Sequence, residues 1–463
     1  MLANRDRLLA ALFAVQLLAL LVFGLVLVNG THFTSTSTTK TVYVGGAAPT
    51  ASGVPTAVQT QQAGTPGTPG TSSTTTSTTT SGQGGAPVKA DDSGSGTVKH
   101  GSPVKVGAIV SQTGAINFAA SAQGTKAYVD LVNSQGGVNG HKIQLDLRDD
   151  QLSKVRGQAQ AQELVSEGVF AFMGWQAPLT ESDIAPFLAR NRIPLVGSYG
   201  VGGEYHSPWA YSFQSHHYGY EMGRYLGLEK KVTHPGVIFI SNSSAAVNAA
   251  QVRAFTAGVK STGKTLDSGD VFQPDVTQAS YDNIVTQLRL SGVDGIATLI
   301  DQTAYNRLQQ AFDRQGYHPV HVADPLFTDP TVVQSSATDG TLVASDFATL
   351  DQGGPDVQQY VRTVRAQFGD KAEISYIGMG GWLSAKVFVE ALRRMGDTIT
   401  RDNLLKAMNS LPSNVGGDFT PQGMHFGPTQ AHDPNQCLQL SKVTSGKLTP
   451  YKRFSCDTLS FDS

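Results

Sequence analysis

The segment VKVGAIVSQTGAINFAASAQGTKAYVDLVNSQGGVNGHKIQLDLRDDQ, at residues 104–151, decides the fold of this chain. It opens with VKVGAIV, a short β-branched apolar run typical of a buried strand. Apolar or small residues then recur at intervals of three or four positions: Phe118, Ala122, Thr125, Val129 and Val132. This spacing predicts a helix with one buried face. GGVNG ends that helix and turns the chain into a second strand, IQLDL at 143–147.

The same alternation of strand and helix continues along the chain. Five further apolar runs follow: FAFMG (170–174), PLVG (194–197), GVIFI (236–240), GIATLI (295–300) and GTLVAS (340–345). Helical spacing appears from Tyr281 to Leu288 and from Leu383 to Met395. Strands that alternate with helices predict βαβ units and parallel sheets. Because about 360 residues exceed one sheet domain, we expect two α/β lobes, with a barrel as the alternative.

An apolar run precedes the region of strands and helices. The run from Leu8 to Val28 would span about 30 Å as a helix, the hydrocarbon thickness of a bilayer. Two arginines precede it and no further lysine or arginine follows before Lys40, which puts the N-terminus in the cytosol and the rest outside. Residues 1–30 are therefore expected to be a transmembrane anchor or, since VNG at 28–30 would permit cleavage, a signal peptide.

Residues 31–103 separate this apolar run from the predicted lobes. They are dominated by Thr, Ser, Gly, Pro and Ala, as in TSSTTTSTTTSGQGG at 71–85. Such a segment buries too little apolar area to offset its chain entropy, so we expect a disordered linker. The formal net charge of the whole chain is −2, which gives no indication of a nucleic-acid partner.

The chain contains two cysteines, Cys437 and Cys456. The sequences CLQLSKV and KLTPYKRFSC lie on either side of a Thr-Ser-Gly turn, which predicts a hairpin that brings the cysteines nearly opposite each other. In an oxidising compartment such a pair usually forms a disulfide. Two free thiols are the alternative.

These motifs resemble the type I periplasmic-binding proteins of the branched-chain amino-acid (Leu/Ile/Val)-binding class. The likeness is carried within 104–151 by the first strand, its Thr-Gly loop, GGVNG and a strand that ends in Asp-Asp. It continues in ELVSEGVFAFMGWQAPLTESDIAPFLARNRIPLVGSYG at 163–200, where a glycine ends the third strand and Ile-Pro-Leu opens the fourth.

The resemblance implies two Rossmann-like lobes with parallel sheets, joined by three crossovers, within residues 104–463. Lobe I would comprise about 104–218 and 349–412, and lobe II about 219–348 and 413–463. A ligand would bind between the lobes and close them as a hinge. The resemblance also implies an extracellular solute-binding protein that delivers a small molecule to an ABC permease in the membrane.

Ligands of parallel α/β sheets bind beyond the carboxyl ends of the strands. The residues at those positions that could contact a ligand are Gln112, Asn117, Phe118, Trp175, Gln176, Ser198, Tyr199, Asn242, Asp301, Gln302 and Asp324. Asp301 or Asp324 could pair with a ligand ammonium. Ser198 fits the amino-acid clamp of the family, but Val201 stands where a threonine is common. The expected solute is therefore an amino acid, an amide or an aromatic acid.

Structural roles are the alternatives for these candidates. Ser243 and Asp301 could cap helices instead of contacting a ligand, since both residue types are favoured caps. Trp175 and Tyr199 could be aromatic residues of the core or of the interface between the lobes.

The sequence does not predict catalysis. His206, His216 and His217 lack the i, i+4 spacing of a HExxH zinc site, and the predicted disulfide would leave no thiol nucleophile. We therefore expect no catalytic residue, metal or cofactor. The expected function is solute capture at the extracytoplasmic face of the cell membrane, or in secreted form if the first helix is cleaved. The alternative is a ligand-sensing receptor or cell-surface domain that acts on a membrane partner.

Overall fold

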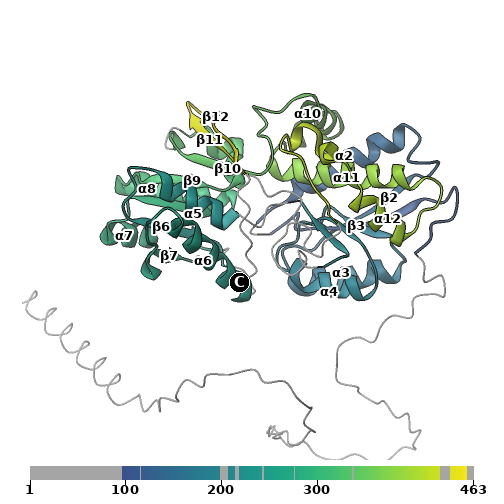
Figure 1. The fold of residues 1–463 in the computed structure, drawn as a ribbon, viewed down its shortest axis with the longest axis horizontal. Coiled ribbons are helices and arrows are strands. Elements are labelled where there is room, and N and C mark those ends of the chain that lie inside the picture. The colour runs from purple at the N-terminus through teal and green to yellow at the C-terminus, as the bar shows by residue number, and fades with distance from the viewer. Residues whose placement is uncertain are drawn as a thin grey trace, which may run out of the picture. The chain divides into compact units, whose positions relative to one another are not determined.

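The computed structural model describes residues 96–455, apart from 115, 199–206, 214–217, 242–244, 276, 336–337 and 428–437. This part of the chain forms two β-sheets with helices packed on them (Figure 1). The predicted anchor or signal segment and nearly all of the predicted linker lie outside the described residues. Among the described helices, none combines the length and the apolar character needed to cross a membrane.

The first sheet has the strand order β2-β1-β3-β4-β5, and all of its neighbouring pairs are parallel. Its strands and connecting helices are β1 (Val104–Val110), α2 (Ala119–Ser134), β2 (Ile143–Asp149), α3 (Lys154–Ser166), β3 (Ala171–Met173), α4 (Glu181–Arg190), β4 (Leu195–Ser198) and β5 (Ala210–Ser212). The apolar runs of the sequence predicted the first four strands, and the structure confirms them. β5 was not predicted.

The second sheet has the strand order β12-β11-β10-β9-β8-β6-β7 and is parallel from β10 to β7. Its parallel part and helices are α5 (Tyr218–Leu228), β6 (Pro235–Phe239), α6 (Ala245–Lys260), η2 (Ser268–Asp270), β7 (Val271–Phe272), α7 (Asp282–Ser291), β8 (Gly295–Leu299), α8 (Gln302–Gln315), β9 (Val320–Ala323), η3 (Pro325–Thr328), α9 (Pro330–Val333) and β10 (Leu342–Ser345).

The chain then returns to the first sheet before it ends on the second. The returning helices are α10 (Pro355–Phe368), η5 (Gly369–Lys371), α11 (Tyr376–Met395), α12 (Arg401–Asn409) and η6 (Ser413–Phe419). α11 packs on α2 and β4. We call the first sheet with α2–α4 and α10–α12 the first lobe, and the second sheet with α5–α9 the second lobe.

The chain passes between the two sheets three times: after β5, after β10, and between η6 and β11. The lobe boundaries given above remain predictions. For the last boundary, between lobe I and lobe II at residues 412/413, the packing favours a position beyond Phe426. η6 contacts α10 and α11, and the ring of Phe426 lies 5.9 Å from that of Tyr211 in the first lobe.

The predicted C-terminal hairpin is confirmed. β11 (Leu438–Thr444) and β12 (Lys447–Ser455) are antiparallel, and β11 adds to the second sheet beside β10. Ser445 and Gly446 have φ angles of 49° and 72°, the left-handed values that a two-residue hairpin turn requires. Cys437 and Cys456 lie outside the described residues.

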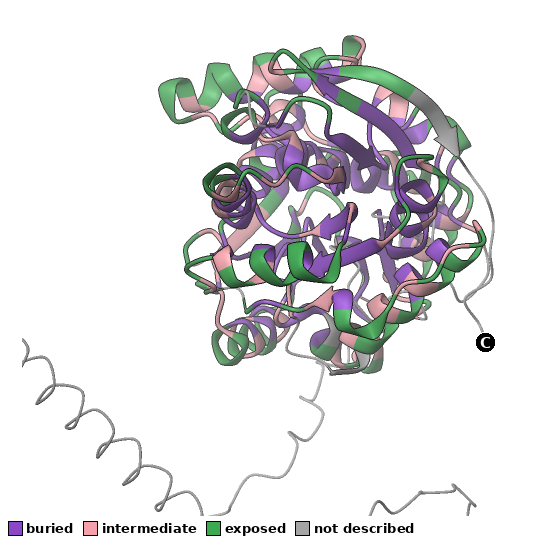
Figure 2. Cartoon of the chain, turned by 90° about the vertical axis from the view of Figure 1, so that its left-hand side faces the viewer, coloured by how far each residue is buried: buried purple, intermediate pink, exposed green. Residues whose placement is uncertain are grey.

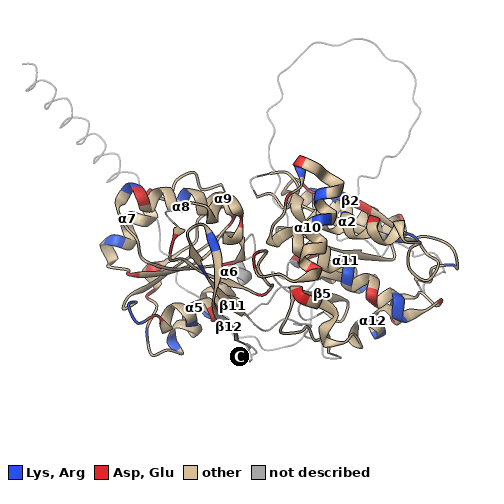
Figure 3. Ribbon diagram, turned by 90° about the horizontal axis from the view of Figure 1, so that it is seen from above, with Lys and Arg blue, Asp and Glu red and all other residues tan. Residues whose placement is uncertain are grey.

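The core of each lobe lies between its sheet and its helices, as the burial colours show (Figure 2). Glycines bring helix pairs into close contact in both lobes. A Cβ atom at Gly381 of α11 would overlap the Ser121 carbonyl oxygen of α2, and one at Gly258 of α6 would overlap the Tyr220 carbonyl oxygen of α5. Acidic and basic residues are intermixed on the outer helices, α7 and α10 among them (Figure 3).

The first described residues are attached to the first lobe. The amide of Val98 donates to the Ile399 carbonyl oxygen at 2.9 Å. Arg401, at the start of α12, donates to the carbonyl oxygens of Phe170 and Val169 at 2.9 and 2.8 Å. The segment that leads into β1 is therefore held beside the residues just before α12.

Candidate ligand-binding cleft

A cavity of about 810 Å³ lies between the two lobes. From the first lobe it is lined by residues around the start of α2 and by the stretch from the end of α10 to the start of α11: Asn117, Ala120, Arg365, Gly369, Asp370, Ala372, Glu373, Ile374, Ser375 and Ile377. From the second lobe it is lined by Gln302, Asp329, Pro330 and Thr331. Small-molecule sites usually have volumes of roughly 300–1,000 Å³, so this cavity has the size of a ligand site.

Two of the predicted site residues meet at this cavity. Asn117 lies in the loop after β1, where its Oδ1 accepts a hydrogen bond from the Ala119 amide at 2.7 Å. Gln302 is the first residue of α8, after β8. Both positions follow the carboxyl ends of parallel strands, which is why the sequence predicted them. The two side-chain amides can donate and accept hydrogen bonds from opposite sides of the cavity.

Acidic side chains predominate among the charged residues of the cavity. Asp329, Asp370 and Glu373 line it together with Arg365. Burial raises the pKa of Glu373, and the Asp329 carboxylate raises it further. Because Asp329 belongs to the second lobe and Glu373 to the first, like charges from both lobes repel across the cavity. A cationic group of a ligand would relieve this repulsion.

A smaller hollow of about 10 Å³ adjoins the cavity through Ile377. Its lining includes Gln176, which is 4 % exposed and follows β3. The Gln176 Oε1 atom is buried and accepts no hydrogen bond from the residues that the structure describes. A buried acceptor without a partner is costly, so this oxygen is suited to receive a donor from a ligand or a water.

Phe118 and Trp175 lie in the core of the first lobe and not at the cavity. Phe118 is 3 % exposed and Trp175 is fully buried. Trp175 packs among apolar residues, with its ring 5.2 Å from that of Phe172. Trp175 is therefore a core residue in this structure, which was the alternative to ligand contact. Contact of either ring with a ligand stays a prediction.

Asp301 and Asp324 occupy helix N-termini, as the capping alternative expected for Asp301. Asp301 accepts from the amides of Thr303 and Ala304 at 2.8 and 3.0 Å. Asp324 accepts from the Tyr305 hydroxyl at 2.9 Å and is 3 % exposed. Burial raises the pKa of both carboxyls. Neither residue lines the cavity, so their pairing with a ligand ammonium stays a prediction that the packing does not favour.

The remaining predicted residues do not meet at the cavity in the described part of the chain. The amide of Gln112 donates to Asp149 Oδ1 at 2.9 Å, and Gln112 does not line the cavity. Ser198 ends β4, but its side chain lies outside the described set. Tyr199 and Asn242 lie outside the described residues altogether.

A buried polar cluster, which the sequence did not predict, joins the crossovers between the lobes. The Asp346 carboxylate, just after β10, accepts from the hydroxyls of Tyr218 at 2.5 Å and Tyr376 at 2.7 Å. The Gln422 side chain donates to the Asp346 carbonyl oxygen at 2.9 Å. Burial raises the pKa of Tyr218, and the adjacent Asp346 carboxylate adds to the effect. We call these residues the hinge cluster, because Tyr218, Asp346 and Gln422 each lie beside a different crossover.

The sequence also missed the cavity residues of the α10–α11 connection. Arg365 lies within α10, and Glu373 and Ser375 follow a helix rather than a strand, so the rule of strand carboxyl ends does not select them. Their one sequence signal is Ser375 at the position before the helical pattern of α11. There its Oγ caps the helix by accepting from the Gly378 amide at 3.3 Å.

Comparison with known proteins places this geometry in a family. Residues 103–447 match the periplasmic binding protein family. A "Leu/Ile/Val-binding protein homolog 8" of Brucella abortus is 24 % identical over 339 residues, which cover 68 % of this chain and 81 % of that protein.

Solved structures share the fold. A branched-chain amino acid ABC transporter protein from Thermus thermophilus with bound valine superposes with a TM-score of 0.67 at 18 % identity, covering 78 % of this chain and 98 % of that chain. A solute-binding protein of an ABC transporter from Rhodopseudomonas palustris, in complex with 3,4-dihydroxybenzoic acid, gives a TM-score of 0.63 at 18 % identity, covering 78 % and 99 %.

The chain belongs to the periplasmic binding protein family, since the match covers most of its length. The resemblance predicted from residues 104–200 is thereby confirmed, as is the expectation of a solute-binding protein. The family is one of binding proteins rather than enzymes.

Proposed function

We propose that this protein captures a small solute between its two lobes at the extracytoplasmic face of the membrane and delivers it to an ABC-type permease. The observation that carries the proposal is the cavity of about 810 Å³ lined from both lobes, with Asn117 and Gln302 on opposite sides. Closure of the lobes about the hinge cluster would bring these two side chains onto one ligand. The proposal includes neither catalysis nor a cofactor.

An amino acid or another compound with a cationic group is the proposed solute class. Asp329, Asp370 and Glu373 supply negative charge at the cavity, and Arg365 can receive a carboxylate. The solved structures with bound valine and with 3,4-dihydroxybenzoic acid keep amino acids and aromatic acids in the set to be tested. Trp175, which could have packed against an aromatic ligand, is fully buried in the core instead.

A membrane anchor and a linker are part of the proposal. The apolar run from Leu8 to Val28 would hold the protein at the membrane, and residues 31–103 would give the lobes reach. This arrangement also favours the second candidate function, a ligand-sensing receptor or cell-surface domain that acts on a membrane partner. A sensor would bind a solute and contact a signalling protein, whereas an importer subunit would stimulate a permease.

A thermal-shift screen of the full-length protein tests solute binding directly. Amino acids, amides, aromatic acids, sugars and short peptides form the panel. A true ligand at a hundredfold excess over its Kd stabilises the native state by about 2.7 kcal/mol. We expect the strongest stabilisation from amino acids. A cooperatively unfolding sample that responds to no compound would contradict solute capture.

Substitution at the cavity then tests the site. Asn117→Ala and Gln302→Ala should each weaken binding of the ligand found in the screen about fivefold to tenfold, because each removes hydrogen bonds worth about 1 kcal/mol. Gln287→Ala, at an exposed position of α7, is the matched control and should leave the Kd unchanged. Isothermal titration measures all three, and equal affinities in the cavity variants would place the ligand elsewhere.

We also propose that Cys437 and Cys456 form a disulfide. The support is the register of the hairpin, in which Leu438 pairs with Ser455, the residues next to the two cysteines. Thiol alkylation of the denatured, unreduced protein should label no cysteine, and two after reduction. Reduction should also lower the midpoint of thermal unfolding, because it releases the constraint on the unfolded chain. The double variant Cys437→Ser with Cys456→Ser should not respond to the reductant. Labelling of both thiols without reduction would rule the bridge out.

A further inference from the structure

One histidine and two aspartates precede neighbouring strands at the edge of the second sheet opposite the cavity. His234 immediately precedes β6, Asp270 immediately precedes β7, and Asp294 immediately precedes β8. These strands are parallel neighbours in the order β8-β6-β7, so the residues before them lie at one edge of the sheet. Ligand clefts form at the carboxyl ends of such strands, whereas this group lies at the amino ends.

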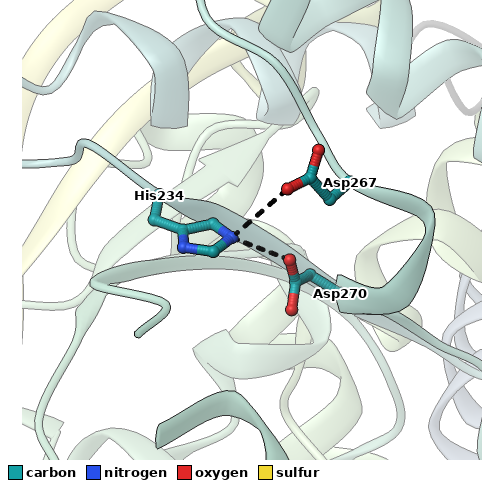
Figure 4. A group of neighbouring side chains, drawn as sticks. All are labelled: His234, Asp267 and Asp270. Atoms are coloured by element: carbon teal, nitrogen blue, oxygen red, sulfur yellow. Dashed lines mark hydrogen bonds and ion pairs between the residues drawn. The ribbon is translucent and has the colours of Figure 1, made fainter. Parts of the chain in front are cut away.

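His234, Asp267 and Asp270 face one another in a compact group (Figure 4). The Nε2 atom of His234 lies 2.8 Å from Asp270 Oδ2 and 3.8 Å from Asp267 Oδ2. All three potential ligand atoms lie within 4.8 Å of one another. In a tetrahedral zinc site with bonds of about 2.0–2.2 Å the ligand atoms are about 3.3–3.6 Å apart, so small side-chain rotations would complete the geometry.

The surroundings of the group carry an excess of negative charge. The Asp270 side chain is only 5 % exposed. In the described part of the chain, no lysine or arginine nitrogen lies within 4.0 Å of the carboxylates of Asp267 or Asp270. Asp294 adds a third carboxylate and fixes the backbone, because it accepts from the amides of Thr233 and His234 at 2.9 Å. Burial and the carboxylates of Asp294 and Asp270 raise the pKa of nearby Tyr317, and the Arg289 guanidinium only partly offsets this.

We propose that His234, Asp267 and Asp270 bind a divalent transition-metal ion such as Zn²⁺. One imidazole nitrogen and two carboxylate oxygens form a donor set that suits Zn²⁺, with water in the remaining position. Asp267 and His234 are 69 % and 33 % exposed as side chains, so an ion can enter from solvent, while buried Asp270 supplies a fixed ligand. The ion would join the start of β6 to the η2–β7 segment. The sequence predicted no metal, because these residues have no recognisable spacing along the chain.

Titration of the tag-free, full-length protein with ZnCl₂ tests the proposal. The chain has 11 histidines, so the comparison between variants matters more than the total stoichiometry. We expect His234→Gln and Asp267→Asn each to weaken one equivalent of Zn²⁺ at least tenfold in isothermal titration. Co²⁺ should give a visible absorption band in the wild-type protein that both variants lack.

Two features of the design separate metal binding from folding and from solute capture. Asp267→Asn alters a mostly exposed side chain, so this variant keeps the fold even if His234→Gln does not. His318→Gln removes an exposed histidine of the same lobe and should titrate like the wild type. Zn²⁺ isotherms and Co²⁺ spectra that are identical in wild type and Asp267→Asn would overturn the proposal, whatever the solute screen yields.

Discussion

Gly258→Val is expected to destabilise the protein by about 3 kcal/mol or more, because it forces α5 and α6 apart. A Cβ atom at Gly258 would overlap the Tyr220 carbonyl oxygen, which is backbone and cannot rotate away. Gly223 on α5 approaches the Phe255 backbone in the same way, so the two helices meet along a reciprocal glycine contact. A valine must therefore displace a whole helix, together with the apolar residues that pack beneath it.

Denaturant and thermal unfolding of the variant measure this effect. Gly269→Val is the matched control, since a Cβ atom at Gly269 meets no atom within 4 Å and its φ angle is not left-handed. The control should change stability by no more than about 0.5 kcal/mol. Equal midpoints for the two variants would show that α5 and α6 can separate without cost.

Acidification from pH 6.5 to pH 4 is expected to lower the free energy of unfolding by about 3 kcal/mol through His321 alone. His321 is 5 % exposed, and its Nε2 lies 2.7 Å from the Thr298 hydroxyl. Burial lowers its pKa to about 3, below the value of about 6.5 in an unfolded chain. The neutral ring therefore contributes its full stability above pH 6.5. That contribution is lost as the pH falls toward 3, because the unfolded state then binds the proton more tightly.

The free energy of unfolding of His321→Gln, measured between pH 4 and pH 8, tests the assignment. Glutamine cannot protonate, so the variant should lose stability at neutral pH but show a flatter acid limb than the wild type. The exposed His318→Gln should keep the wild-type slope. An unchanged slope in His321→Gln would mean that other groups cause the acid sensitivity.

Much of the fold could be predicted because its strands are apolar on both faces. Such runs stand out when helices cover both sides of a parallel sheet, as at 104–110 and 295–300. β9 (Val320–Ala323) escaped prediction because His321 interrupts its apolar pattern, although the side chain is buried against Thr298. β7, with two residues, is too short for any pattern.

The cleft could be predicted only in part, because capping and ligand binding use the same residue types. Asn117 and Gln302 reach the cavity, whereas Asp301 satisfies the first amides of α8. Sequence position cannot distinguish these outcomes, since all three residues follow a strand. For Trp175 the same ambiguity lies between a ligand wall and the core, and depends on the direction of one side chain.

The contact between Val98 and Ile399 has a mechanical consequence. Whatever tension the preceding chain transmits enters the molecule through the first lobe. The chain reaches the second lobe through three crossovers, and the hinge cluster lies beside them. If the lobes close on a solute as proposed, a tether on this side would hold the first lobe while the second lobe moves. A fluorescent label on the second lobe would then report closure as a change of its distance from the tethered first lobe.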